Sequence, residues 1–112
     1  AFLTTRVREP DKDDWGKLAC MMRYLQATKK LVQNLEADKM LVIKWYIDGA
    51  HAVHHDMRGH TGAVMTFGKG AVNSSSSKQK INTMSLTETE LIGVNDKMGQ
   101  VLWTKYFLEA QG

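Results

Sequence analysis

The stretch Ser85-Leu86-Thr87-Glu88-Thr89-Glu90-Leu91 decides the fold, because it opens the longest periodic segment of the chain. Ser85 followed by Glu88 matches a capping box, in which each side chain satisfies a backbone N–H at a helix start. Apolar residues then recur every three or four positions, which predicts a helix from Leu86 to about Leu108 with one buried stripe. The residues of this stripe are Leu91, Val94, Met98, Val101, Leu102 and Tyr106.

Glu90 lies in the first turn of this predicted helix, near the positive end of its dipole. A carboxylate is favoured there, so Glu90 can be an ordinary first-turn acid or a functional residue. The best strand of the chain, Leu41 to Ile47, is rich in branched and aromatic residues and ends at Asp48-Gly49. Alternation places Trp45 and Ile47 on one face of that strand and Tyr46 and Asp48 on the other.

Further elements are predicted on both sides of this strand. Pro10-Asp11 begins a helix with a stripe of Trp15, Leu18, Met22 and Leu25, which fades near Thr28. Weak alternation over 29–37 favours a strand. Residues 61–67 and 71–75 predict two more strands joined by a hairpin turn at 68–70, with Asp48 on the central strand of the sheet. Residues 74–80 then form a polar, basic connection into the long helix.

Histidines gather between the predicted strands, at His51, His54, His55 and His60, with Asp56 among them. Zinc binding is one interpretation, but no cysteine pair or spaced histidine motif accompanies them, so a solvated loop is favoured. Ser75-x-x-Lys78 has the spacing of penicillin-recognising enzymes, but no helix is predicted to start there. Lys78 and Lys80 are either a solvated connector or contacts to phosphate.

Composition bounds the remaining choices. The 112 residues are 43% hydrophobic and 24% charged, which indicates one globular domain or a piece of one. The net charge of +3 is compatible with a polyanionic partner. The single Cys20 fits a reducing compartment, and no apolar run has the length of a membrane span. Because the chain begins without methionine, we expect it to be trimmed or cut from something longer.

An ordered series of motifs runs through the chain and resembles one known family. The series is Trp45-Tyr-Ile-Asp48-Gly, Asp56-Met-Arg58-Gly-His-Thr61-Gly62, Gly68-Lys-Gly-Ala-Val, Ser75-Ser-Ser-Lys-Gln-Lys, Ser85-Leu-Thr-Glu-Thr-Glu90-Leu-Ile and Val101-Leu-Trp103. It resembles the RNase H domain of copia-type retrotransposon polyproteins. Residues 2–29 are similar to the stretch that joins reverse transcriptase to RNase H in the same polyproteins.

The resemblance implies an α/β fold. Residues 39–112 would be the N-terminal part of an RNase H-like domain, with a mixed sheet and a long packed helix. Residues 1–38 would be the connection helix and hairpin that end a reverse transcriptase. In the family a third carboxylate and a His/Asp pair follow further along the chain. None of these lies within the 112 residues, so the expected domain is truncated.

The resemblance also implies a reaction, hydrolysis of the RNA strand of an RNA–DNA hybrid with two Mg²⁺ ions. Asp48 and Glu90 match the family's catalytic, metal-binding carboxylates, although Gly49-Ala50-His51 departs from the usual residues after the aspartate. Arg58, Lys78 and Lys80 are candidates for backbone contact. Whether the chain itself is an enzyme is left open, because two ligands alone should hold Mg²⁺ weakly and leave it inactive.

The partners implied are the hybrid and the rest of the polyprotein, in a cytoplasmic particle or the nucleus, without a membrane. The alternative is a domesticated or remnant piece that acts as a structural or binding module, in which case other protein subunits could be partners.

Overall fold

The computed structural model describes residues 3–39 and 42–112. The chain divides into two compact units, with the boundary in the sequence between Asn34 and Leu35, and each unit is described by itself. Leu41, where the predicted second strand begins, lies outside the described residues.

The first unit consists of a short 3-10 helix, η1 (Leu3–Arg6), and one α-helix, α1 (Lys12–Thr28). The helix start predicted at Pro10-Asp11 is confirmed, because Asp11 is the N-cap of α1. The Asp14 amide donates to Asp11 Oδ1 at 2.8 Å, and the Asp11 amide donates to Asp14 Oδ2 at 3.1 Å. This reciprocal pair satisfies two donors that a helix start leaves unpaired.

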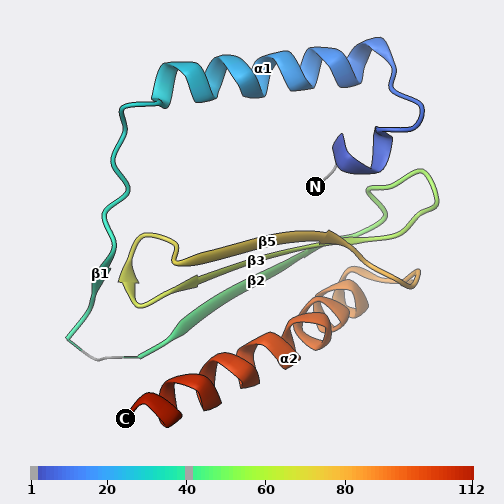
Figure 1. The fold of residues 1–112 in the computed structure, drawn as a ribbon. Helices are drawn as coiled ribbons and strands as arrows, with labels where there is room; N and C mark the ends of the chain where they lie inside the picture. Colours follow the sequence, from blue (N-terminus) through green and yellow to red (C-terminus); the bar gives the residue numbers. More distant parts are fainter. Residues whose placement is uncertain (1–2, 40–41) are drawn as a thin grey trace. The chain divides into compact units, whose positions relative to one another are not determined.

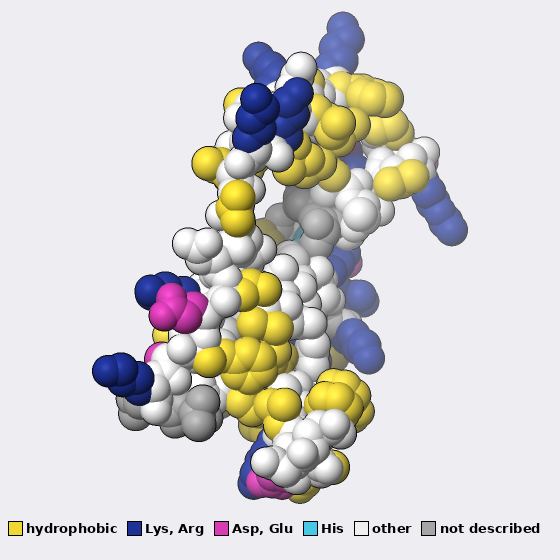
Figure 2. All heavy atoms as spheres, turned by 60° about the vertical axis from the view of Figure 1, so that its left-hand side comes forward, with side chains coloured by type: hydrophobic (Ala, Val, Ile, Leu, Met, Phe, Trp, Pro, Cys, Tyr) yellow, Lys and Arg dark blue, Asp and Glu magenta, His cyan; other side chains and the backbone are white. Residues whose placement is uncertain are grey.

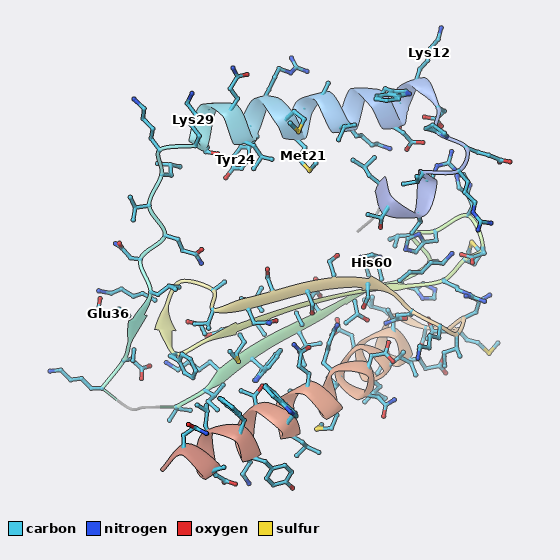
Figure 3. All side chains as sticks on the ribbon, in the orientation of Figure 1. Lys12, Met21, Tyr24, Lys29, Glu36 and His60 are labelled. Atoms are coloured by element: carbon cyan, nitrogen blue, oxygen red, sulfur yellow. The ribbon has the colours of Figure 1, made fainter. Side chains whose placement is uncertain are left out.

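The apolar side chains of α1 remain at the surface. Figure 3 shows Met21 and Tyr24 projecting from one side of the helix and Lys12 from the other, and both apolar residues are exposed. Trp15 on the predicted stripe is 62% exposed. Figure 2 shows hydrophobic side chains, in yellow, at the surface of the first unit beside lysines and arginines.

The second unit is built on a three-stranded antiparallel sheet with the order β2-β3-β5 (Figure 1). Its strands are β2 (Lys44–Ala50), β3 (His60–Thr66) and β5 (Asn73–Lys78). A second, two-stranded sheet pairs β1 (Glu36–Ala37) with β4 (Gly68–Lys69), also antiparallel. The α/β class is therefore confirmed, but the described residues form antiparallel sheets and not the expected mixed one.

Several predicted boundaries are wrong. The strand expected over 29–37 is reduced to β1. Its partner is β4, which lies outside the first 38 residues, so the described residues do not form the hairpin expected there. Because Gly68 and Lys69 are in this pairing, the turn predicted at 68–70 is partly strand. Residues 74–77 do not begin a connection to the long helix as predicted, because they lie within β5. They pair with β3, and this pairing continues to Lys78.

The strand that carries Asp48 also differs from its prediction. It continues through Asp48 to Ala50, where it pairs with His60. It is an edge strand of the described sheet, and β3 is the central one. The alternation of its side chains is as predicted: Tyr46 and Asp48 are exposed, while Ile47 is half-buried.

The long helix α2 (Leu86–Gln111) lies along one face of this sheet (Figure 1). The predicted N-cap is confirmed, because the Ser85 hydroxyl accepts from the Glu88 amide at 3.2 Å. The Glu88 carboxylate accepts from the amide of Met84, the residue before the N-cap, at 2.7 Å. The helix start is therefore fixed by its own side chains.

The predicted burial of the apolar stripe of α2 is wrong. Leu91 is 65% exposed, and Val94, Met98 and Leu102 are each more than 40% exposed. The buried residues are Thr89, Gly93, Lys97 and Thr104, on the opposite side of the helix. The physical reason is close approach, since a β-carbon on Gly93 would lie 3.4 Å from the Thr61 side chain and 3.6 Å from Ile47.

Candidate metal and nucleic-acid site

The first turn of α2 and the end of β2 touch through two small residues. A β-carbon built on Gly49 would lie 2.9 Å from the carbonyl oxygen of Thr89, too close for any side chain to occupy. Thr89 is fully buried in this contact. Asp48 and Glu90 are the sequence neighbours of these two residues, so the contact holds both carboxylates at the same end of the second unit.

Asp48 projects from the face of the sheet that α2 leaves uncovered. Gly49 and Ile47 face the helix, and the alternation along β2 therefore turns Asp48 away from it. Across the sheet Asp48 is in register with Gly62, and Gly62 with Ser76. Because Gly62 has no side chain, open space is left between Asp48 and Ser76, and this space forms part of a shallow depression of about 640 Å³.

Glu90 lies on the flank of α2 that points away from β5. Gln100 marks the opposite flank, because its side chain reaches Asn73 of β5 at 3.4 Å. Helical spacing places Gln100 and Glu90 on either side of Gly93, which packs against the sheet. Glu90 therefore lies on the side of α2 away from β5, whereas Asp48 lies on the face of the sheet that α2 leaves uncovered.

Both carboxylates are exposed, and neither has a hydrogen-bond or ion-pair partner within residues 3–39 and 42–112. Their oxygens are the type of donor that Mg²⁺ prefers, and their exposure leaves room for the waters that Mg²⁺ keeps. Within the same ranges no three His, Cys, Asp or Glu side chains come together closely enough to hold a metal ion. Asp48 and Glu90 are therefore of the donor type that Mg²⁺ prefers, but they are not part of a three-ligand cluster within the described residues.

The three basic candidates differ in their surroundings. Lys78, the last residue of β5, donates to Asp56 Oδ2 at 2.6 Å. Arg58 places its Nε 3.4 Å from the same oxygen. Lys80 is exposed just beyond the strand. The structure therefore brings Arg58 and Lys78 together around Asp56.

A chain of hydrogen bonds joins two of the histidines that the sequence predicts to lie in a solvated loop, and no sequence motif indicates it. The Ser76 hydroxyl lies 2.7 Å from His60 Nε2, and His60 Nδ1 lies 2.9 Å from His54 Nε2. Only 6% of His54 is exposed. Burial is the main cause that lowers the pKa of His54, and the nearby charge of Lys78 lowers it further. Burial is also the main cause that lowers the pKa of His60, followed by the neighbouring His54.

A second group of polar side chains holds the start of α2 in place. His51 Nδ1 lies 2.9 Å from Thr89 Oγ1, and the buried Gln79 amide donates to the Thr89 carbonyl at 2.9 Å. The Gln79 amide also donates to Thr61 Oγ1 at 3.0 Å. No sequence signal marked Gln79, because a glutamine in a polar run reads as a surface residue.

Comparison with known proteins identifies a relative in a plant transposon. The retrovirus-related Pol polyprotein from transposon TNT 1-94 of Nicotiana tabacum is 30% identical to the chain over 107 residues. These residues are 95% of the chain but 8% of that polyprotein. No family model matches, and no solved structure matches. The chain is therefore related to a segment of a retrotransposon polyprotein.

No helix in the described ranges is long and apolar enough to cross a bilayer.

Proposed function

We propose that residues 39–112 form the first part of a ribonuclease H-like domain and that residues 1–38 are the end of a reverse transcriptase. The order of elements supports this: three antiparallel strands are followed by a long helix on one face of their sheet. Asp48 lies on the first of these strands and Glu90 in the first turn of the helix. The contact between Gly49 and Thr89 carries the proposal, because it fixes that turn against the strand with Asp48.

The proposed reaction of the intact polyprotein is hydrolysis of the RNA strand of an RNA–DNA hybrid. Asp48 and Glu90 would hold Mg²⁺, which when bound activates the attacking water and stabilises the leaving oxygen. The two carboxylates are exposed, and no described residue pairs with either of them. Because two carboxylates are only part of a complete site, we expect the isolated chain to bind Mg²⁺ weakly and not to cleave.

The edge position of β2 supports the same proposal. Its outer edge has no strand partner among the described residues, so its backbone groups there are available for pairing. A further strand of the polyprotein that paired at this edge would place its side chains beside Asp48. The remaining ligands of a magnesium site could be supplied in this way.

We assign the phosphate contacts of the hybrid to Arg58, Lys78 and Lys80. Binding should then weaken steeply with salt, because lysines and arginines displace counterions from the nucleic-acid backbone. Such a substrate implies that the protein acts inside the cell, in a cytoplasmic particle or the nucleus.

The test uses the chain as part of its continuous polyprotein, together with Asp48→Asn and Glu90→Gln variants. A hybrid with 5′-labelled RNA is incubated with and without Mg²⁺, and the products are separated by size. We expect Mg²⁺-dependent cleavage of the RNA strand, lost in both variants. Cleavage that persists in Asp48→Asn, or none by the unmodified polyprotein at any Mg²⁺ concentration, would reject the proposal.

A second candidate function is a binding module that keeps the fold without the chemistry. The exposed apolar stripe of α2 favours it, because contiguous apolar surface often marks a protein contact. The coding sequence past Gly112 separates the two. A further strand with an acidic motif supports the nuclease, whereas a stop codon supports the module.

A further inference from the structure

Two cations of the second unit share one carboxylate. Lys78 Nζ lies 2.6 Å from Asp56 Oδ2, and Arg58 Nε lies 3.4 Å from the same oxygen. Asp56 is on the loop between β2 and β3, and Lys78 is at the end of β5. The ion pair therefore bridges segments 22 residues apart in the sequence.

The loop is shaped to present Asp56 to these cations. The Met57 amide donates to the His54 carbonyl at 2.8 Å, and the Arg58 amide reaches Asp56 Oδ1 at 3.5 Å. Met57 has a φ of 61°, a left-handed conformation that a residue with a side chain adopts rarely. Backbone of this kind persists only where its surroundings hold it.

The ion pair satisfies the cations only in part. Arg58 engages the carboxylate through Nε, and its two terminal nitrogens have no partner within the described residues. The side chains of Asp56, Arg58 and Lys78 are 45%, 43% and 30% exposed, so solvent and ligands can reach all three. An ion pair this exposed is weak and can be exchanged for another anion.

We propose that Asp56 occupies the position of a nucleic-acid phosphate, and that a phosphodiester of the hybrid must displace it from Lys78 and Arg58 to bind. The inference rests on the proposed function, because it takes the hybrid backbone as the ligand. A carboxylate and a phosphodiester are both monoanions that offer two oxygens to the same donors. The incoming phosphate first meets the terminal nitrogens of Arg58 and then takes Lys78 from Asp56.

Asp56 thereby acts as a built-in competitor that lowers affinity for every polyanion without specifying sequence. Lys78 Nζ cannot hold both anions at full strength, and Asp56 repels a phosphate brought close to it. Burial and the neighbouring cations oppose each other at this carboxyl, and the hydrogen bond from Lys78 dominates and lowers the pKa of Asp56. The competitor is therefore charged at neutral pH.

The experiment measures binding of a fluorescent 20-base-pair RNA–DNA hybrid by anisotropy, with the 112-residue chain in 50 mM salt and no Mg²⁺. Asp56→Asn should bind about two- to fivefold more tightly than the unmodified chain, the range that breaking one exposed ion pair spans. Its slope of log affinity against log salt should steepen by about one unit, for one more phosphate contact. Asp56→Ser, which removes the carboxylate differently, should give the same gain.

Asp13→Asn is the matched control, because Asp13 is an exposed carboxylate 2.5 Å from Lys17 and its loss changes the net charge equally. It should bind like the unmodified chain. In the Lys78→Gln background, Asp56→Asn should bring little gain, since the contested donor is gone.

Equal affinities for Asp56→Asn and Asp13→Asn would overturn the inference, as would a gain that persists in full without Lys78 or an absence of binding in every variant. The proposed nuclease function is tested separately by cleavage. An unchanged affinity in Asp56→Asn alongside cleavage by the polyprotein would therefore reject only the inference.

Discussion

Gly49 and Thr89 lie so close that a β-carbon on the glycine would stand 2.9 Å from the threonine carbonyl oxygen and 3.1 Å from its carbonyl carbon. These atoms belong to the backbone and cannot move aside as the end of a flexible side chain could. The distance between β2 and the first turn of α2 is thus set by the absence of one methyl group. Both carboxylates of the candidate metal site depend on that distance, because each adjoins one of the two residues.

Gly49→Ala should destabilise the second unit by about 1–3 kcal/mol, the usual cost of adding a methyl group to a filled contact. Urea unfolding followed by tryptophan fluorescence measures it. Gly62→Ala is the matched control on the same sheet, because a β-carbon there meets no atom within 4 Å. Its free energy of unfolding should stay within about 0.5 kcal/mol of the unmodified chain. Equal effects of the two substitutions would show that the contact with Thr89 is not tight.

A similar comparison within α2 tests which side of the helix packs. Gly93→Leu should destabilise the protein by at least about 1 kcal/mol, since its side chain would enter the space held by Thr61 and Ile47. Gly99→Leu meets nothing within 4 Å and should stabilise the helix by up to about 1 kcal/mol, because leucine is the better helix former. The difference between their unfolding midpoints in urea is the measurement, and a smaller loss in Gly93→Leu than in Gly99→Leu would contradict the packing.

The sequence predicted the start, the length and the first turn of α2, but it predicted the wrong buried face. The start was predictable because Ser85 and Glu88 act on backbone groups next to them, and such local chemistry is visible in sequence. The buried face was not, because hydrophobic periodicity points to Leu91 and Met98, which are exposed. Close approach through Gly93 depends on the partner strand and leaves no apolar signal.

The errors in the predicted sheet also arise where the structure depends on residues that are distant in the sequence. The alternation along β2 was correct, because a branched and aromatic run shows its two faces directly. The extension of β5 through Ser76 and Ser77 was not predicted, since serine has weak strand propensity and the strand depends on pairing with β3. The ion pair of Asp56 with Lys78 was likewise invisible, because it joins a loop to a strand far along the chain.

Gln79→Ala should destabilise the protein by roughly 1–3 kcal/mol from the lost hydrogen bonds, with a further loss from the space left behind. Gln79 is 1% exposed, and its amide donates to Thr61 and to the Thr89 carbonyl. Gln26→Ala, an exposed glutamine of α1, is the control and should change stability by less than about 0.5 kcal/mol. Hydrogen exchange of the Thr89 amide provides a local measurement, because the first turn of α2 should lose protection only in Gln79→Ala.

The histidine chain should make the protein less stable as the pH falls from 7.5 to 5.5. Burial is the main cause that lowers the pKa of both His54 and His60 in the folded protein, whereas the unfolded chain has ordinary values near 6.5. The unfolded state therefore binds more protons below that value, and the free energy of unfolding decreases with acidification until the folded-state pKa values are reached. Asp14 and Asp56 do not contribute in this window, since their lowered carboxyl pKa values matter only below about 3.8.

The measurement is the free energy of unfolding in urea at the two pH values. His54→Gln should show a smaller loss between pH 7.5 and 5.5, because its side chain no longer takes up a proton on unfolding. His55→Gln, an exposed neighbour in the same loop, should keep the pH dependence of the unmodified chain. If His54→Gln and the unmodified chain lose the same stability over this range, the pair of His54 and His60 does not control the pH response.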